Sequence, residues 1–164
     1  LENVITAMHP PPSYNVLDVG FFTTRKKRRE REVAEQCMEY LKIVGLDHLA
    51  EEKPGNLPYG LQRKLEIARA LATQPKVLLL DEPAAGLNPS EVQEFIELVK
   101  ELQHLYNFSV IVIEHRMEVI MTLSKHIYVL TFGKLLAEGS PLEIQCNAAV
   151  MEAYLGEGDD GCSI

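Results

Sequence analysis

Two adjacent carboxylates, Asp81 and Glu82, follow the apolar run Val77–Leu80. Such a run is typical of a strand buried on both faces of a parallel sheet, and open α/β sheets bind ligands at the carboxyl ends of their strands. Because successive strand side chains point to opposite faces, the two carboxylates can take different tasks. An Asp here suits Mg²⁺, which prefers oxygen ligands, and a neighbouring Glu can activate water for attack on a phosphate. From these residues alone, a strand end with two surface acids is an equally good interpretation.

Two further residues stand at places where chemistry is often done. Gly60 lies at the start of a helix predicted from about Tyr59 to Thr73, and helix N-termini attract anions. His115 comes shortly after a second apolar strand, Phe108–Ile113. Without context, a glycine at a helix start and a histidine after a strand are more often structural than catalytic.

The elements that must position these residues alternate along the chain. Helices are expected near 1–8, 25–44, 59–73, 89–102 and 116–123, and strands at 77–81, 108–113, 127–130 and 135–137. The helix after Asn88 has a cap signature, Asn88-Pro89-Ser90-Glu91. Strands that alternate with helices predict an α/β layered fold with a parallel sheet. Residues at about 9–25 are expected to contain an irregular loop, and residues 159–164 a frayed tail.

Composition narrows the class of protein. The chain has 164 residues, 46% of them hydrophobic and 24% charged, with a net charge of −8. These values are those of a globular domain and disfavour a disordered, collagen-like or membrane-spanning chain. The acidic balance disfavours a general nucleic-acid binder. The one basic run, Arg25–Arg31, is best interpreted as a solvated helix face, with contact to a partner protein or to lipid headgroups left open.

Four segments in register resemble the ATP-binding cassette (ABC) ATPases, and the resemblance runs from residue 1 to about residue 158. VLLLDEP resembles their Walker B strand, which assigns Mg²⁺ binding to Asp81 and the catalytic base to Glu82. His115 matches the switch histidine that senses the γ-phosphate. The signature sequence, which in the family caps ATP bound to a second subunit, corresponds to Leu57, Pro58, Tyr59, Gly60, Leu61 and Gln62. The D-loop corresponds to Ala85, Gly86, Leu87 and Asn88.

This resemblance implies a fold, a function and partners. The fold would be a partial P-loop NTPase (RecA-like) core with parallel strands, at 76–158, preceded by the ABC helical subdomain at 1–75. LENVITAMH, LEIARALATQP, DEPAAGLNP and AYLGEG are similar to ATPases of branched-chain amino acid importers. Such a subunit binds and hydrolyses ATP with Mg²⁺, pairs with a second ATPase subunit and drives a membrane permease. It would be cytoplasmic and peripheral on the inner face of the cell membrane, without a nucleic-acid partner.

The sequence also departs from the family pattern. It contains no GxxxxGK followed by Ser or Thr, the motif that holds the β- and γ-phosphates, so we expect an N-terminally truncated domain with exposed sheet edges and apolar faces. Pro58 replaces a signature Ser, Leu61 replaces Gln, and Arg116 stands where Asp is common. These departures motivate an alternative, a non-hydrolysing interaction module. A DNA-repair or chromosome-maintenance ATPase shares the motifs but needs coiled-coil arms, and no sustained heptads are present.

Overall fold

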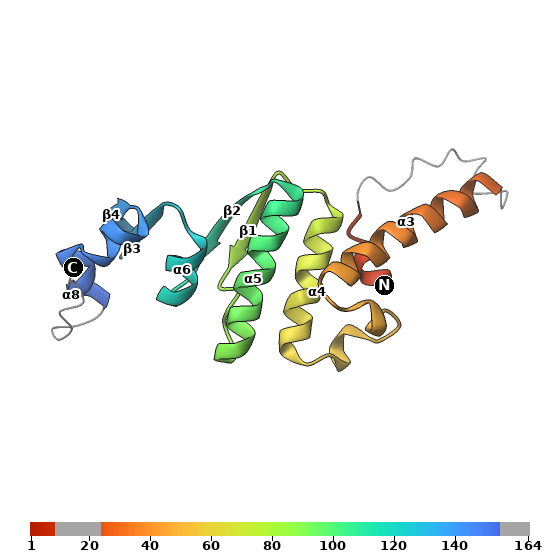
Figure 1. The fold of residues 1–164 in the computed structure, drawn as a ribbon, viewed down its shortest axis with the longest axis horizontal. Helices are drawn as coiled ribbons and strands as arrows, with labels where there is room; N and C mark the ends of the chain where they lie inside the picture. Colours follow the sequence, from red (N-terminus) through yellow and green to blue (C-terminus); the bar gives the residue numbers. More distant parts are fainter. Residues whose placement is uncertain (9–23, 155–164) are drawn as a thin grey trace. The chain divides into compact units, whose positions relative to one another are not determined.

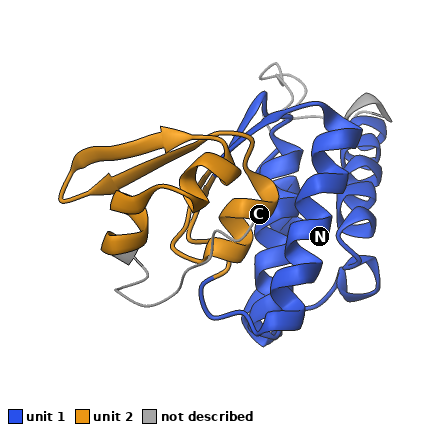
Figure 2. Cartoon of the chain, turned by 60° about the vertical axis from the view of Figure 1, so that its left-hand side comes forward, with its two compact units in different colours: residues 1–79, 85–111 blue, residues 80–84, 112–164 orange. Residues whose placement is uncertain are grey.

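The computed structural model describes residues 1–8 and 24–154. The chain divides into two compact units (Figure 2), which we treat separately. Unit 1 contains residues 1–79 and 85–111, and unit 2 contains residues 80–84 and 112–164. The predicted tail at 159–164, and most of the loop predicted at about 9–25, lie outside the described residues.

Unit 1 is built mainly from helices (Figure 1). They are α1 (Glu2–Ile5), α3 (Thr24–Ile43), α4 (Tyr59–Ala72) and α5 (Pro89–Tyr106), with short 3₁₀ turns η1 (Asp47–Leu49) and η2 (Pro54–Asn56) between α3 and α4. Helix α3 buries Cys37 and Leu41, as the apolar spacing predicts, and ends before Gly45, whose φ of +75° suits a glycine C-terminal stop. No described helix has both the length and the apolar character that a membrane span requires.

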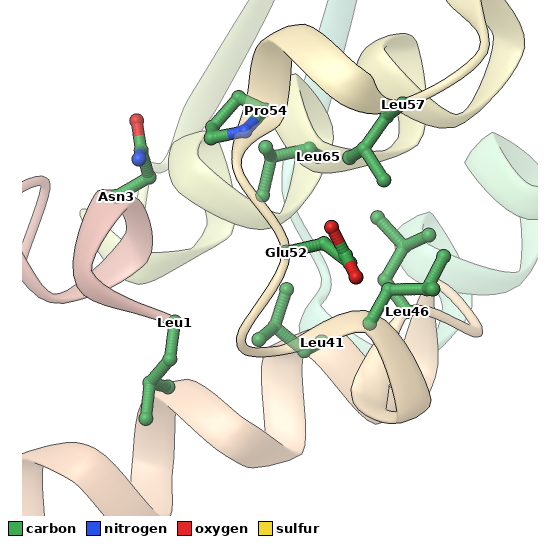
Figure 3. A pocket seen from close by; sticks show the side chains of 9 residues that line it. Leu1, Asn3, Leu41, Leu46, Glu52, Pro54, Leu57 and Leu65 are labelled. Carbon is green, nitrogen blue, oxygen red and sulfur yellow. The ribbon is translucent and has the colours of Figure 1, made fainter.

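The helices α1, α3 and α4 pack against one another and enclose a small cavity (Figure 3). Leu41, Leu46, Leu57 and Leu65 contribute to its wall, and Glu52 lies at the same place. Its volume is about 20 Å³, which is room for roughly one water molecule. The cavity is therefore a packing gap of the helical core and has no room for a nucleotide.

Helix α5 follows the sequence prediction closely. The side chain of Asn88 accepts a hydrogen bond from the backbone N–H of Glu91 at 3.0 Å, and the carboxylate of Glu91 accepts one from the Asn88 N–H at 2.9 Å. This reciprocal pair satisfies two N–H groups at the helix start. The five side chains expected to point inward are all at most 3% exposed: Val92, Phe95, Ile96, Val99 and Leu102.

Strands β1 (Val77–Asp81) and β2 (Ser109–Ile113) form a parallel pair. At one end the Ser109 N–H donates to the Lys76 carbonyl at 3.0 Å, and at the other the Glu82 N–H donates to the Ile113 carbonyl at 2.8 Å. Since both strands run from the first bond to the second, their carboxyl ends meet at the same edge. The prediction of a parallel arrangement is therefore confirmed for this pair.

The prediction that these strands are buried on both faces is wrong for the described chain. Leu78 and Leu80 are at most 9% exposed, but Val77 is 49% and Leu79 is 71% exposed. In β2, Ile111 is 56% exposed. An apolar run does not reveal how many layers cover a strand, and here the described residues cover only one face. The apolar sheet face that we expected to be exposed is therefore the face that carries Val77, Leu79 and Ile111.

Unit 2 contains α6 (Met117–Leu123), β3 (Ile127–Thr131), β4 (Lys134–Gly139), α7 (Pro141–Gln145) and α8 (Ala148–Tyr154). The third predicted strand, β3, does not join the parallel pair but forms an antiparallel hairpin with β4. In the hairpin turn, Phe132 and Gly133 have φ of 45° and 74°, the left-handed backbone that closes tight hairpins. Ile127, Val129, Ile144 and Val150 form the core of this unit.

The exposed face of β1 and β2 leads to a prediction about association. We expect the 164-residue chain to form dimers or larger species and to bind a hydrophobic dye, because Val77, Leu79 and Ile111 leave apolar surface uncovered. Replacing Leu79 and Ile111 by Thr, which keeps strand propensity, should shift the chain toward monomer in size-exclusion chromatography with light scattering.

The matched control is Leu105→Thr, which removes a similarly exposed leucine (57%) from α5 rather than from the sheet. It should leave the association unchanged. A wild-type chain that is monomeric and binds no dye would contradict the prediction.

Candidate functional site

The edge of β1 and β2 carries the two carboxylates that the sequence singles out. Asp81 ends β1 and is exposed, and Glu82 follows it with 57% of its side chain exposed. The backbone of Glu82 has φ of +44°, a left-handed conformation that costs a non-glycine residue about 1 kcal/mol. Its N–H is held by the Ile113 carbonyl. The chain therefore turns sharply at Glu82, and a hydrogen bond to the neighbouring strand holds that turn.

His115 lies beside Glu82, although the two are far apart in the sequence. The distance from His115 Nδ1 to Glu82 Oε1 is 3.8 Å, and the histidine side chain is 66% exposed. This separation is within ion-pair range when the imidazole is protonated. A carboxylate and an imidazole thus stand at one accessible sheet edge, where the parallel order of the strands brings their segments together.

Sequence reasoning missed a third side chain at this edge, Glu114. Its carboxylate side chain is 0% exposed. Oε1 accepts a hydrogen bond from the Ala84 N–H at 2.8 Å, and Oε2 accepts from the N–H groups of His115 at 3.0 Å and Arg116 at 3.2 Å. The only available signal was an acidic residue between an apolar strand and a histidine, which does not predict burial.

Arg116, which departs from the family pattern, also contacts this edge. Its Nη1 donates to the Ala84 carbonyl at 3.4 Å. Ala84 is therefore bound through its N–H by Glu114 and through its carbonyl by Arg116.

In unit 1 the signature segment forms the start of α4. Pro58 is the N-cap and provides no side-chain cap, and the N–H groups of Leu61 and Gln62 both donate to its carbonyl at 3.0 Å. The side chain of Gln62 reaches back to the Leu57 carbonyl at 2.8 Å, and Leu57 is buried. This segment is therefore shaped by its own backbone and by Gln62.

Tyr59 and Gly60, in the middle of the signature segment, contact the segment between β1 and α5. A Cβ placed on Gly86 would lie 2.9 Å from Cε1 of Tyr59, and Gly86 has φ of +75°. On Gly60, a Cβ would lie 2.7 Å from Oε1 of Glu91. At Gly86 the positive φ and the close ring both favour glycine, whereas at Gly60 a Cβ would displace the carboxylate end of the Glu91 side chain.

Arg63 also contacts Tyr59. Its guanidinium carbon lies 4.8 Å from the ring centroid of Tyr59, and its Nη2 donates to the tyrosine hydroxyl. A hydrogen bond to the Glu66 carboxylate raises the pKa of Arg63 above its ordinary value, with Tyr59 adding to the effect. The Tyr59 ring is thus in contact with the Arg63 cation and lies close to the backbone of Gly86.

The predicted D-loop residues have separate structural roles. Leu87 is buried and Ala85 is half-buried. Asn88 caps α5. The segment is therefore anchored by one apolar side chain and one helix cap, with Gly86 between them against Tyr59.

The described residues could hold a divalent cation only with one or two protein ligands. Among residues 1–8 and 24–154, no three His, Cys, Asp or Glu side chains are grouped as a metal site. Mg²⁺ usually keeps several waters and takes one or two carboxylates together with substrate phosphates. Asp81, exposed at the end of β1, fits that use as a single oxygen donor.

Beside His115, unit 2 has a cavity of about 70 Å³. Glu114 and His115 form its polar wall, and Met117, Ile120 and Val129 belong to its apolar lining. Ligand pockets typically measure about 300–1,000 Å³. A nucleotide therefore does not fit within this cavity.

Comparisons with known proteins give a consistent picture. Residues 4–85 match the model of the family described as ABC transporter, and residues 134–160 match that described as branched-chain amino acid ATP-binding cassette transporter. The chain is 43% identical over 157 residues to the high-affinity branched-chain amino acid transport ATP-binding protein BraF of Pseudomonas aeruginosa. It is 41% identical to the high-affinity branched-chain amino acid transport ATP-binding protein LivG of Escherichia coli. In both cases the match covers 96% of this chain and 62% of the relative.

Solved structures agree with the sequence relatives. The ADP conformation of MJ1267, an ATP-binding cassette of an ABC transporter, superposes with a TM-score of 0.73 at 30% identity, over 94% of this chain and 62% of that one. The cbiO1 protein of Clostridium perfringens, part of the cbiONQ transporter complex, gives 0.67 at 30% identity over 76% of this chain and 49% of that one. The chain thus spans about three fifths of the length of the curated relatives it matches.

The contact between Tyr59 and Gly86 leads to a stability prediction. We expect Gly86→Ala to lower the free energy of unfolding by about 1–2 kcal/mol through left-handed strain, and by about 1 kcal/mol more through displacement of the Tyr59 ring. Urea denaturation measures both.

Gly45→Ala is the matched control, because Gly45 has the same φ of +75° but a Cβ placed on it would have nothing within 4 Å. In a Tyr59→Ala background, Gly86→Ala should lower the free energy of unfolding by no more than Gly45→Ala does, because the ring that it displaces is gone. Equal losses for Gly86→Ala and Gly45→Ala would show that the ring contact is unimportant.

Proposed function

Because the chain belongs to the ABC transporter family, we propose that it is the C-terminal portion of the ATP-hydrolysing subunit of an importer. The observation that supports this most strongly is the approach of His115 to Glu82, 3.8 Å apart, at the carboxyl ends of a parallel strand pair. Open α/β sheets bind ligands at such an edge. Both side chains are more than half exposed and accessible to a nucleotide and to water.

We assign one task to each of the three side chains at this edge. Asp81 binds Mg²⁺, and the metal, when bound, neutralises charge that develops on the phosphates. Glu82 accepts a proton from the water that attacks the γ-phosphorus. His115 donates a hydrogen bond to a γ-phosphate oxygen. It also lies close enough to Glu82 for an electrostatic interaction with that carboxylate.

The signature segment has a different task in this proposal. Residues 57–62 face ATP bound to a second ATPase subunit, with Ala85–Asn88 at the same junction. The start of α4 favours an anion through its backbone N–H groups and its dipole. Pro58 provides neither a hydroxyl nor an N–H, so the anion contact rests on Tyr59 and Gly60 rather than on a serine side chain.

The solute and the partners are inferred from relatives. The matched proteins from Pseudomonas aeruginosa and Escherichia coli are described as branched-chain amino acid transport ATP-binding proteins. We propose that this chain serves uptake of branched-chain amino acids or similar small solutes. Its partners would be integral membrane permease subunits and a second ATPase subunit, and its place the cytoplasmic side of the cell membrane.

Substitution of the proposed base tests the function. In the gene product that contains these residues, Glu82→Gln should lower kcat for ATP hydrolysis by about 100-fold or more, because the amide cannot accept the proton. Binding of Mg²⁺ and ATP, measured by calorimetry, should be retained. Steady-state phosphate release and calorimetric titration are the two measurements.

Glu138→Gln, an exposed acid on β4, is the control and should leave both readings unchanged. Unchanged turnover in Glu82→Gln would refute Glu82 as the base. A wild-type protein that neither binds nor hydrolyses ATP would instead support the non-hydrolysing interaction module that Pro58 and Leu61 motivate.

A further inference from the structure

We propose that Glu114 is a positioning residue that holds His115 beside Glu82. This inference rests on the proposed function in that Glu82 and His115 act on the nucleotide. It begins from the side chain of Glu114, which is 0% exposed although it is a carboxylate. A buried carboxylate is stable only when its oxygens are hydrogen-bonded, so its partners indicate what it does.

The partners of Glu114 are all backbone N–H groups, and they come from two segments. Oε1 accepts from Ala84, two residues after Glu82, at 2.8 Å. Oε2 accepts from His115 at 3.0 Å and from Arg116 at 3.2 Å. One carboxylate therefore ties the turn after β1 to the turn after β2.

Glu114 continues the strand pairing beyond the point where the backbone ladder ends. The last ladder bond joins the Glu82 N–H to the Ile113 carbonyl at 2.8 Å. Beyond this bond the two segments turn, and the carboxylate of Glu114 accepts the next hydrogen bond, from the Ala84 N–H, in place of a backbone carbonyl. Arg116 adds a bond from the other side, to the Ala84 carbonyl at 3.4 Å.

The geometry separates positioning from direct catalysis. Oε2 of Glu114 is 3.8 Å from Nδ1 of His115, too far for a hydrogen bond, and both oxygens are already used by backbone donors. The carboxylate is also fully shielded, so it neither takes a proton from water nor contacts a nucleotide. It acts on the reaction by fixing the backbone of residues 84 and 115, and its charge also lies 3.8 Å from the His115 imidazole.

Because both carboxylate oxygens of Glu114 accept hydrogen bonds, Glu114→Gln is the variant that tests the proposal. Glu114→Gln keeps the shape but has one acceptor oxygen, and its NH₂ group faces backbone donors. Glutamine can therefore serve Ala84 or the pair His115 and Arg116, but not both. The result should be a loosened connection between the two turns with little change in packing.

Amide hydrogen exchange without nucleotide is the first readout, and it does not depend on hydrolysis. In Glu114→Gln, either the amide of Ala84 or those of His115 and Arg116 should exchange about tenfold faster or more, while the same amides in the control Glu138→Gln keep wild-type rates. Unchanged exchange at all three amides would overturn the proposal.

Turnover in the gene product that contains these residues is the second readout. Glu114→Gln should lower kcat about tenfold or more with KM for ATP within about twofold, the pattern of an interaction that matters in the transition state. Faster exchange with unchanged kcat would overturn the positioning role. If the wild type hydrolyses no ATP, the proposed function fails, while the exchange result still confirms or refutes the connection itself.

A measurement on the wild type covers the case in which Glu114→Gln does not fold. Through-hydrogen-bond scalar couplings should appear between the carboxyl carbon of Glu114 and the amide nitrogens of Ala84 and His115. Their presence supports the connection, and their absence, with both amides assigned, overturns it.

Discussion

The hydrogen bond from the Glu82 N–H to the Ile113 carbonyl is the contact on which the candidate site depends. It closes the parallel pair at the end where the strands finish together. Because it fixes residue 82 opposite residue 113, the residues that follow on each strand are neighbours. Glu82, Glu114 and His115 are thus brought together by strand pairing, before any side chain contributes.

The site combines a restrained backbone with accessible side chains. Glu82 has a left-handed backbone and Glu114 is buried, whereas Glu82 and His115 expose more than half of their side chains. Strained backbone persists where surrounding contacts hold it, and such places are often functional. In unit 1, Gly60 and Gly86 show a related arrangement, since each lets another side chain approach the backbone closely. In both units the geometry is set by backbone contacts rather than by large side-chain clusters.

Sequence patterns predicted those features that depend on local interactions. The cap of α5 could be predicted from Asn88 and Glu91 because a capping box involves residues three apart. The stop at Gly45 follows equally from local backbone conformation. The meeting of residues 82 and 115 was not itself predicted; it follows from the parallel order of the two strands.

The features that sequence reasoning missed depend on distant partners. The exposure of Leu79 is decided by which layers cover the sheet, and the run of apolar residues is the same with one layer or two. The burial of Glu114 involves the N–H of Ala84, which comes from the turn after β1. Both strands of the β3–β4 hairpin were predicted, but their separation from the parallel pair was not, because local residues do not reveal which sheet a strand joins.

Paramagnetic NMR with Mn²⁺ and ATP tests most directly the claim that a metal-bound nucleotide lies at the joined ends of β1 and β2. In the isotope-labelled gene product that contains these residues, Mn²⁺ substitutes for Mg²⁺ and broadens signals of nearby nuclei. We predict strong broadening of Asp81, Glu82 and His115 when ATP is present, clearly stronger than that of Glu138 on β4. Broadening that spares these three residues, or that is the same without ATP, would contradict the account.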